Sequence, residues 1–388
     1  MNRPFRKLAR LTLQIAAALC VSAGMTACGG DEDEPTPGDK TEQETPDEPA
    51  TPDEPTQPDE PAPELPTVPV KIPSMATGAD VSWLTELEDK GYKFQNTSGE
   101  EKELMTMLRD EYGMNSIRLR VWVNPADGYN NIDDVMKKAR RAHALGMALM
   151  IDFHFSDTWA DPAHQTVPAA WSDLSPVRIA NAIKEHVTDM LTAMLNEGMA
   201  PAWVQIGNET SQGMLFESGK MNGQNAGEFP RYLNAGYDAV KTLSPDTQVI
   251  VHLPNGYDTG LYTWFFDLVK KNGGKYDMIG MSLYPETETW PVETEEQKVD
   301  DCLKNIAMLK QRYGKDVMIC EIGFHYSRGE EAYRVIRKIF DSNVAVEELK
   351  GVFYWEPEAP EHYNGGYDKG CFVNGRPNRA LEAFRPTR

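Results

Sequence analysis

The chain has 388 residues, of which 40% are hydrophobic and 26% charged, enough for one large domain or two small ones. Its 60 acidic residues outnumber its 39 lysines and arginines, and the formal net charge is −21. The sequence shows no basic patch, so nucleic-acid binding is not expected.

Residues 1–27 have the pattern of an export signal. "MNRPFRKLAR" is basic, and "LTLQIAAALCVSAGM" is an apolar run too short to span a bilayer stably. Cys28 follows in "TAC", which resembles the lipobox of bacterial lipoproteins, where the cysteine becomes the lipidated N-terminus. The next residues, "GGDEDE", are similar to the surface-export signals of Bacteroidetes lipoproteins. An ordinary secretion signal with an incidental cysteine is the alternative.

Residues 28–72 differ in composition from the rest of the chain. Residues 29–71 contain 11 prolines, 14 acidic residues, 2 lysines and no aromatic residue. Such a segment cannot bury enough apolar surface to fold, and proline and like charges keep it extended. We predict a lipid-anchored, disordered linker that carries a monomeric domain on the cell surface, as in an outer-membrane lipoprotein. The lipid is the only membrane contact expected, and the periplasmic face is the less favoured location.

From residue 73 to 388, short apolar runs alternate with amphipathic stretches. The predicted strands are residues 75–82, 116–122, 147–155, 202–207, 248–253, 277–284, 316–323 and 351–357. Apolar residues at helical spacing predict helices within residues 99–113, 132–146, 177–198, 229–243 and 294–314. This alternation predicts a single α/β catalytic domain, a (β/α)8 TIM barrel. A doubly wound open sheet is the alternative, but the Gly-rich phosphate turn that often accompanies it is missing.

In such a barrel, function is located where the strands end, at the C-terminal face. The polar and aromatic residues near the predicted strand ends are Arg118, Arg120, Trp122, Asp152, His154, Asn208, Glu209, His252, Asn255, Asp258, Ser282, Tyr284, Glu321, Trp355 and Glu356. Taken singly, an arginine can pair with a carboxylate inside the barrel, and Trp355 can cap the core. Burying so many polar groups is costly unless they bind one another or a ligand, so together they indicate a functional cleft.

Glu209 and Glu321 end the fourth and seventh predicted strands, across the mouth of the barrel. Glycoside hydrolysis needs two such carboxylates: one protonates the leaving oxygen, and the other, ionised, attacks the anomeric carbon. Asn208 is predicted to hold a sugar hydroxyl beside the leaving group. Arg118 and Tyr284 are predicted to donate hydrogen bonds that keep Glu321 ionised.

Three tryptophans, Trp159, Trp290 and Trp355, offer flat apolar faces suited to stacking on pyranose rings. His154 is predicted to orient its neighbours rather than to act as a general base. Three cysteines remain after the signal and the lipid site, at positions 302, 320 and 371. An odd number argues against a full disulfide framework, although one bridge is left open. Cys302 and Cys320 are predicted to be buried thiols.

Six segments together resemble glycoside hydrolase family 53, the endo-β-1,4-galactanases of clan A. They are "IRLRVWVNPADG", "IDFHFSDTWADPAHQTVPAAW", "IGNETSQGML", "HLPNGYD", "SLYP" and "FYWEP", and the likeness runs from about Gly78 to Trp355. The resemblance implies retaining, endo-acting cleavage of β-1,4-galactosyl bonds in type I (arabino)galactan, which releases galacto-oligosaccharides. It implies that Glu209 is the acid/base and Glu321 the nucleophile.

The resemblance also suggests which residues bind the substrate. Arg118, His154, Asn208, Tyr284 and Trp355 match positions that line the −1 subsite in this clan, and Trp159 matches an aromatic of the substrate groove. Three further strand-end residues, Asp152, Asn255 and Asp258, are predicted to bind substrate as well.

Departures from the family pattern fall in the outer groove. Pro254 replaces a common acidic residue, Phe216 stands where tryptophan is common, and "YPETETW" replaces a more usual "YPFW". The loop after Glu321 is short and shows no clear set of oxygen ligands, so the calcium site of some bacterial relatives is not expected. We expect no metal and no cofactor. Product length and subsite number stay open.

Two other functions fit parts of the sequence. One is a clan-related retaining β-glycanase that acts on mannan or glucan, against which the signature "DFHFSDTWADP" argues. The other is a non-catalytic surface glycan-binding lipoprotein, since a tether and an aromatic groove suit binding equally well. Both Glu209 and Glu321 are present, whereas a decayed enzyme should have lost one carboxylate.

Overall fold

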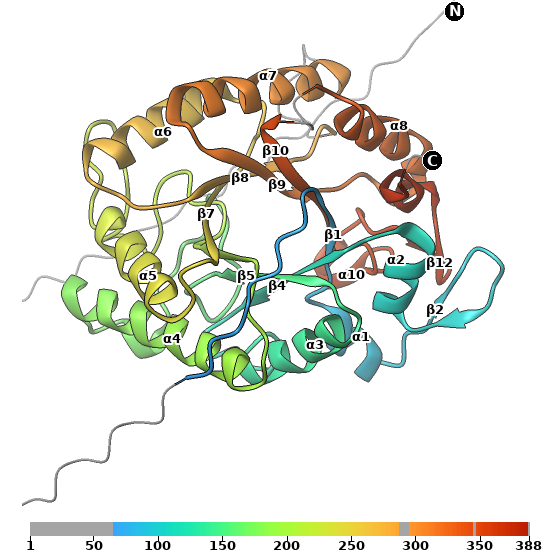
Figure 1. The fold of residues 1–388 in the computed structure, drawn as a ribbon, viewed down its shortest axis with the longest axis horizontal. Coiled ribbons are helices and arrows are strands. Elements are labelled where there is room, and N and C mark those ends of the chain that lie inside the picture. Colours follow the sequence, from blue (N-terminus) through green and yellow to red (C-terminus); the bar gives the residue numbers. More distant parts are fainter. Residues whose placement is uncertain (1–64, 287–294, 344–346, 387–388) are drawn as a thin grey trace, which may run out of the picture. The chain divides into compact units, whose positions relative to one another are not determined.

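The structure is a computed structural model that describes residues 65–286, 295–343 and 347–386. Eight parallel strands form a closed barrel (Figure 1). They are β1 (Ala76–Asp80), β4 (Ser116–Val121), β5 (Ala148–Phe153), β6 (Trp203–Ile206), β7 (Gln248–Leu253), β8 (Met278–Leu283), β9 (Asp316–Ile322) and β10 (Leu349–Trp355). β1 pairs with both β4 and β10, which closes the ring. The eight predicted strands and the (β/α)8 barrel are confirmed.

Helices surround the barrel and follow its strands in the chain (Figure 1). They are α1 (Leu84–Asp89), α2 (Leu104–Tyr112), α3 (Ile132–Ala144), α4 (Pro176–Asn196), α5 (Phe229–Leu243), α6 (Thr259–Lys271), α7 (Glu295–Tyr313) and α8 (Gly329–Phe340). The five predicted helices are confirmed, and α1, α6 and α8 are additional. Short elements, among them the hairpins β2 (Phe94–Gln95) with β3 (Glu101–Lys102) and β11 (Phe372–Val373) with β12 (Arg376–Pro377), lie in the connecting loops.

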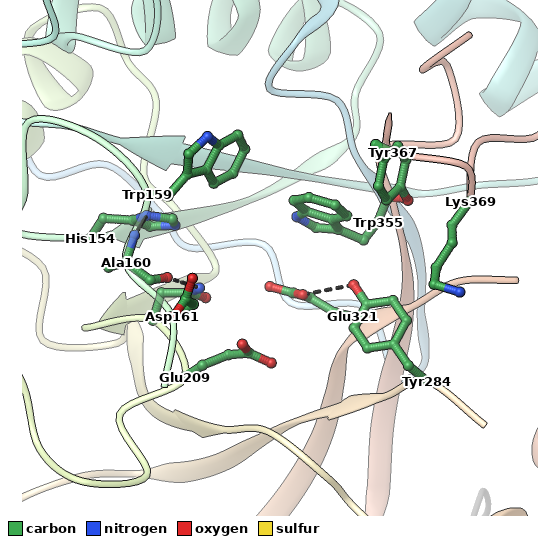
Figure 2. A pocket seen from close by; sticks show the side chains of 11 residues that line it. His154, Trp159, Ala160, Asp161, Glu209, Tyr284, Glu321, Trp355, Tyr367 and Lys369 are labelled. Carbon is green, nitrogen blue, oxygen red and sulfur yellow. Dashed lines mark hydrogen bonds between the residues drawn. The ribbon is translucent and has the colours of Figure 1, made fainter. Parts of the chain in front are cut away.

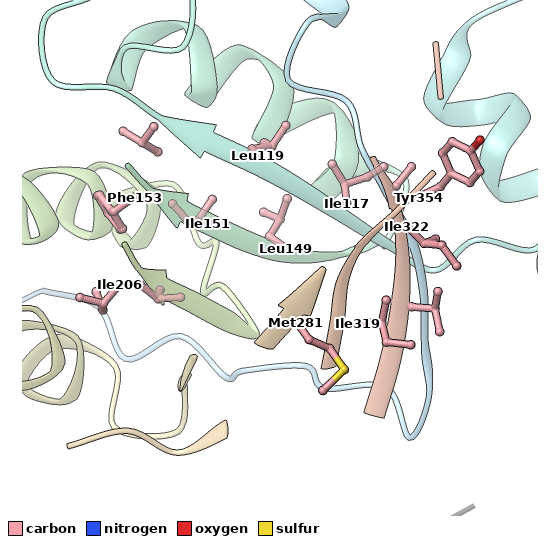
Figure 3. Packing of buried hydrophobic residues seen from close by; sticks show 14 of the residues in the cluster. Ile117, Leu119, Leu149, Ile151, Phe153, Ile206, Met281, Ile319, Ile322 and Tyr354 are labelled. Carbon is pink, nitrogen blue, oxygen red and sulfur yellow. The ribbon is translucent and has the colours of Figure 1, made fainter. Parts of the chain in front are cut away.

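The period of two along each strand divides its side chains between the helices and the barrel interior. Ile117 and Leu119 of β4 belong to the large apolar core, as do Ile151 and Phe153 of β5 (Figure 3). Buried polar residues alternate with them, and Arg118 lies between two such core residues. Every residue of β4 and β5 is therefore buried, because both faces of these strands are covered.

A second apolar cluster, which we call the apolar plug, fills the N-terminal end of the barrel interior. It consists of Ala76, Ala148, Met150, Ala202, Trp203, Ile250, Met278, Met318, Cys320 and Phe353. Trp203 and Phe353 meet edge to face, with their ring centroids 6.1 Å apart. The polar residues of the same strands come later in the chain direction, so they gather at the C-terminal end.

Several predictions concern features other than the helices and strands of the barrel. The signal, Cys28, the linker up to residue 64 and Trp290 lie outside the described residues. The cysteines at positions 302, 320 and 371 are free and buried, which confirms the two predicted thiols. Within the described part of the chain, no helix is long and apolar enough to cross a membrane. Nor do three or more of its His, Cys, Asp and Glu side chains form a group able to hold a metal ion.

Candidate active site

A pocket of about 430 Å³ opens at the C-terminal ends of the barrel strands (Figure 2). It is lined by His154, Trp159, Ala160, Asp161, Asn208, Glu209, Tyr284, Glu321, Trp355, Tyr367 and Lys369. Seven of the predicted site residues are in this lining. The other four, Ala160, Asp161, Tyr367 and Lys369, were not predicted, because they lie in loops after the strands rather than at the strand ends.

Glu209 is presented by a tight turn at the end of β6. Gly207 has φ +83° there, and a β-carbon on it would lie 2.6 Å from Thr210 Cγ2, so only glycine fits. Glu209 itself has φ 46°, an uncommon conformation for a residue with a side chain, found mainly where surrounding structure enforces it. The turn directs the carboxyl group into the pocket (Figure 2). There Ser282 Oγ donates to Glu209 Oε1 at 2.6 Å.

Glu321 reaches the pocket because β9 contains an irregularity. Met281 of β8 pairs with Ile319, but the next residue, Ser282, pairs with Glu321, so β9 holds one extra residue. Such a bulge changes the direction in which the following side chain points. Strict alternation after the interior residue Cys320 would have turned Glu321 toward the helices. Instead its carboxylate accepts hydrogen bonds from Tyr284 Oη at 2.8 Å and pairs with Arg118 Nη1 at 3.0 Å.

Arg118 connects the groups beneath the pocket and is only 1% exposed. Besides Glu321 it pairs with Asp80 and Asp152, each at 2.8 Å. Its Nη2 also donates to Asn208 Oδ1 at 3.0 Å, which fixes the amide that precedes Glu209. Burial opposes the charge on the guanidinium, but the three carboxylates raise its pKa well above the ordinary value. The predicted hydrogen bond from Tyr284 to Glu321 is therefore present, and Arg118 contacts Glu321 as an ion pair.

Asp152 and His154 form the wall below Trp159. Asp152 is fully buried, and burial raises its pKa, but the Arg118 charge and the hydrogen bond from His154 outweigh burial and lower it. His154 Nδ1 accepts the indole N–H of Trp122 at 3.2 Å and the backbone N–H of Ala160 at 3.1 Å. Its Nε2 must then carry the proton, and it donates to Asp152 Oδ2 at 3.1 Å. A ring held on both nitrogens is suited to orienting its neighbours.

The two glutamates have different surroundings and therefore different proton affinities. Burial, followed by the charge of Glu321, raises the pKa of Glu209 to about 8. Burial also raises the pKa of Glu321, but the Arg118 charge and the Tyr284 hydrogen bond act against this shift. Because the two groups repel each other when both are ionised, the pair holds one proton near neutral pH. The better-stabilised anion is Glu321, so the proton belongs to Glu209.

Aromatic rings form the upper walls of the pocket. Trp159 and Trp355 meet edge to face, with ring centroids 5.8 Å apart, and Tyr367 packs edge to face on Trp355 at 4.8 Å. The guanidinium of Arg120 lies 4.3 Å from the Trp159 ring centroid and is paired with the buried Glu356. Arg120 thus supports the aromatic wall from below, a position distinct from that of Arg118.

Four predicted substrate residues do not line the pocket. Asn255 is exposed and has φ 54°, in the turn that follows β7. Asp258 is the N-cap of α6, where its Oδ1 accepts the Leu261 N–H at 2.9 Å. Arg118 and Asp152 lie below the pocket and reach it only through other side chains. Substrate contact by these four residues stays a prediction.

A (β/α)8 barrel with two carboxyl groups, the buried Glu321 and the half-buried Glu209, directed into one aromatic pocket has the architecture of a glycoside hydrolase. The family model Glycosyl hydrolase family 53 matches residues 76–381, and the chain belongs to that family. It is 34% identical to the probable arabinogalactan endo-beta-1,4-galactanase A of Neosartorya fischeri over 304 residues, 72% of this chain and 83% of that protein. The arabinogalactan endo-beta-1,4-galactanase of Thermothelomyces thermophilus is 34% identical over 304 residues, covering 72% and 88%.

Solved structures give the same assignment. A structure of fungal beta-1,4-galactanases superposes with a TM-score of 0.70 at 28% identity, covering 80% of this chain and 98% of that one. The Ignisphaera aggregans GH53 catalytic domain gives a TM-score of 0.71 at 28% identity, covering 83% and 98%. A sugarcane-soil endoxylanase, at 14% identity and a TM-score of 0.54, shares the barrel fold alone.

Proposed function

We propose that this protein is an endo-acting, retaining glycoside hydrolase that cleaves β-1,4-galactosidic bonds in type I (arabino)galactan. The substrate class is supported by family 53 membership and by the galactanases it resembles, which include the two fungal enzymes named above. A clan relative acting on mannan or glucan would share the barrel and the two glutamates. The substrate therefore needs a direct test.

The observation that carries the mechanism is the unequal environment of the two glutamates. Glu321, ionised beside Arg118 and Tyr284, attacks the anomeric carbon and forms a covalent glycosyl-enzyme. Glu209 has a pKa raised to about 8 and is therefore protonated at neutral pH. It gives that proton to the departing glycosidic oxygen. The same Glu209, now ionised, removes a proton from the water that releases the sugar, and the configuration is retained.

Release of reducing ends from galactan, mannan and β-glucan tests the substrate, with the Glu321→Gln variant as the control for contaminating activity. We expect activity on galactan, oligosaccharide products from the start of the reaction, and none from the variant. Proton NMR of the first-formed anomer tests retention. Cleavage of mannan with galactan left intact would contradict the substrate assignment, and an initial α-anomer would contradict the mechanism.

We also propose that the enzyme is a monomeric Bacteroidetes surface lipoprotein, with residues 1–27 as the signal, Cys28 as the lipid site and residues 28–72 as the linker. The lipobox-like sequence and the acidic, proline-rich composition support this proposal. A lipid-anchored endo-enzyme on a long spacer suits first attack on a polymer too large to import. Labelling with a radioactive fatty acid, lost in Cys28→Ala, tests the anchor. Protease digestion of the enzyme on intact cells tests the surface location.

A further inference from the structure

Two buried polar residues next to Glu209 have no part in the mechanism derived so far. Ser282, at the end of β8, places its Oγ 2.6 Å from Glu209 Oε1. His252, at the end of β7, places its Nε2 2.9 Å from the same Oγ. Ser282 is 1% exposed and His252 is 0% exposed, so bulk water does not compete for the bond between them. The three side chains form one hydrogen-bonded row that ends at the pocket.

We propose that Ser282, held in place by His252, is a positioning residue that sets the orientation and the proton affinity of the Glu209 carboxyl group. The inference rests on the proposed function, which makes Glu209 the acid/base. Because Ser282 occupies Oε1, the other oxygen is the one left to exchange a proton with the substrate. His252 also contacts the backbone of this turn, since its carbonyl accepts the Thr210 N–H at 2.9 Å.

The row can serve both protonation states of Glu209. A hydroxyl donates to an ionised carboxylate and can accept from a protonated one. Burial, together with the charge of Arg118, lowers the pKa of His252 well below 6.5, so the ring is neutral and carries one N–H. Its Nδ1 lies 2.9 Å from Gln205 Nε2, a donor, and 2.9 Å from Asn208 Oδ1, an acceptor. Either tautomer of His252 therefore finds a partner, and Ser282 can act as donor or as acceptor.

This matters because the acid/base alternates between the two states in every turnover. In the first step Glu209 must hold a proton, and in the second it must be an anion able to take one. Among the described residues, Ser282 is the side chain that donates a hydrogen bond to the Glu209 carboxyl group, whereas Glu321 has both Arg118 and Tyr284. Removing the Ser282 hydroxyl would destabilise the anion, so the pKa of Glu209 would rise further.

The test compares Ser282→Ala with Ser116→Ala in the full chain. Ser116 is a matched control, since it is a buried serine at the start of β4 whose Oγ bonds the neighbouring Asn115 side chain, far along the strand from the pocket. The readout is the pH dependence of kcat/KM on galactan. In Ser282→Ala the basic limb should move up by about one pH unit, the size expected for one lost hydrogen bond to a charged group. In Ser116→Ala it should not move.

A second readout separates positioning from a general loss of structure. Turnover of galactan by Ser282→Ala should fall about 10- to 100-fold, and turnover of a dinitrophenyl galactobioside, whose departure needs no proton, should fall less in its first step. If Ser282→Ala does not fold, Ser282→Cys retains the shape with a weaker donor and should shift the limb in the same direction. A basic limb that coincides with that of the unmodified enzyme would refute the inference. Failure of the unmodified enzyme to cleave galactan would refute the proposed function instead.

Discussion

The two ends of the barrel interior are built on the same strands but contain opposite chemistry. At the N-terminal end is the apolar plug, in which Met150 of β5 and Trp203 of β6 are fully buried. One alternation further along the same strands come Asp152 and Gln205, also fully buried. The plug stabilises the barrel because it removes apolar surface from water. The polar end costs desolvation, and its groups tolerate this because they bind one another.

The difference shows that the functional groups of this fold are confined to the polar, C-terminal end of the barrel interior. The polar end keeps an arginine, several carboxylates and a histidine out of water. Apolar side chains in the same place would not carry this desolvation cost. The bonds among these polar groups favour the anion of Glu321 over that of Glu209, which is the order that the proposed mechanism requires. Changes at the polar end should therefore alter chemistry, and changes in the plug should alter stability.

The largest expected effect is at Glu321. Glu321→Ala removes the nucleophile, and kcat on galactan should fall on the order of 10⁴-fold or more. Added azide should restore turnover of an activated β-galactoside and give a galactosyl azide of inverted, α configuration, because azide enters the space left by the carboxylate. Product NMR measures this. Normal galactan cleavage by Glu321→Ala would contradict the assignment of Glu321 as the nucleophile.

Arg118→Met should damage stability and activity together. It leaves the buried carboxylates Asp80, Asp152 and Glu321 without their cation, which should cost about 3–5 kcal/mol in the free energy of unfolding. Arg140→Met is the matched control, because Arg140 pairs with Glu197 at the surface, and its change should stay within about 1 kcal/mol. Denaturant unfolding of both variants measures the contrast. Equal effects would show that burial does not distinguish the two arginines.

In the plug, Trp203→Ala should cost about 3–5 kcal/mol of stability through the cavity it leaves. Turnover per folded molecule should change little, because Trp203 lies on the opposite side of Gln205 from the pocket. Denaturant unfolding and kcat measured at low temperature separate the two effects. A loss of turnover as large as that of Glu321→Ala would break the division between the two ends.

The pH dependence of activity follows from the two glutamates. Since Glu209 must be protonated, kcat/KM should fall as the pH rises through about 8, and since Glu321 must be ionised, it should also fall in acid. The pKa of Glu209 is raised by folding, so ionisation in the unfolded chain lowers stability as the pH rises from 4.5 toward about 8. Glu209→Gln, which cannot ionise, should therefore gain stability over that range, on the order of 1–3 kcal/mol at neutral pH. Thermal unfolding of both proteins at pH 4 and pH 8 checks the sign.

The smallest expected effect is at Asp258, which belongs neither to the apolar plug nor to the polar end of the barrel interior. Asp258→Ala removes the N-cap of α6 and should cost about 1 kcal/mol of stability. KM and kcat on galactan should stay close to those of the unmodified enzyme if the residue only caps the helix. A tenfold rise in KM would instead support the sequence-based prediction that Asp258 binds substrate.

Much of the barrel could be predicted because strand and helix periods are local properties. Each of the eight strands was located to within a few residues, and Glu209 and Glu321 were predicted from the positions where strands end. The prediction was weaker in loops. Asp161, Tyr367 and Lys369 reach the pocket from connections whose paths depend on tertiary contacts, such as the hydrogen bond from the Tyr326 N–H to the Asp368 carbonyl. Asp258 shows a further ambiguity, since a carboxylate after a strand can equally begin the next helix.

The sequence by itself determined which residues alternate along each strand, and therefore that Arg118, Asp152 and Gln205 share the barrel interior. Glu321 was predicted from its place at a strand end, but only the tertiary structure decided how its side chain comes to point toward them. By alternation alone its side chain would face the helices, because Cys320 before it faces inward. The extra residue in β9 exists only in the pairing with β8, where Ser282 lies beside Glu321 rather than beside Cys320. That register is a property of two strands together, so no local pattern in either strand could reveal it.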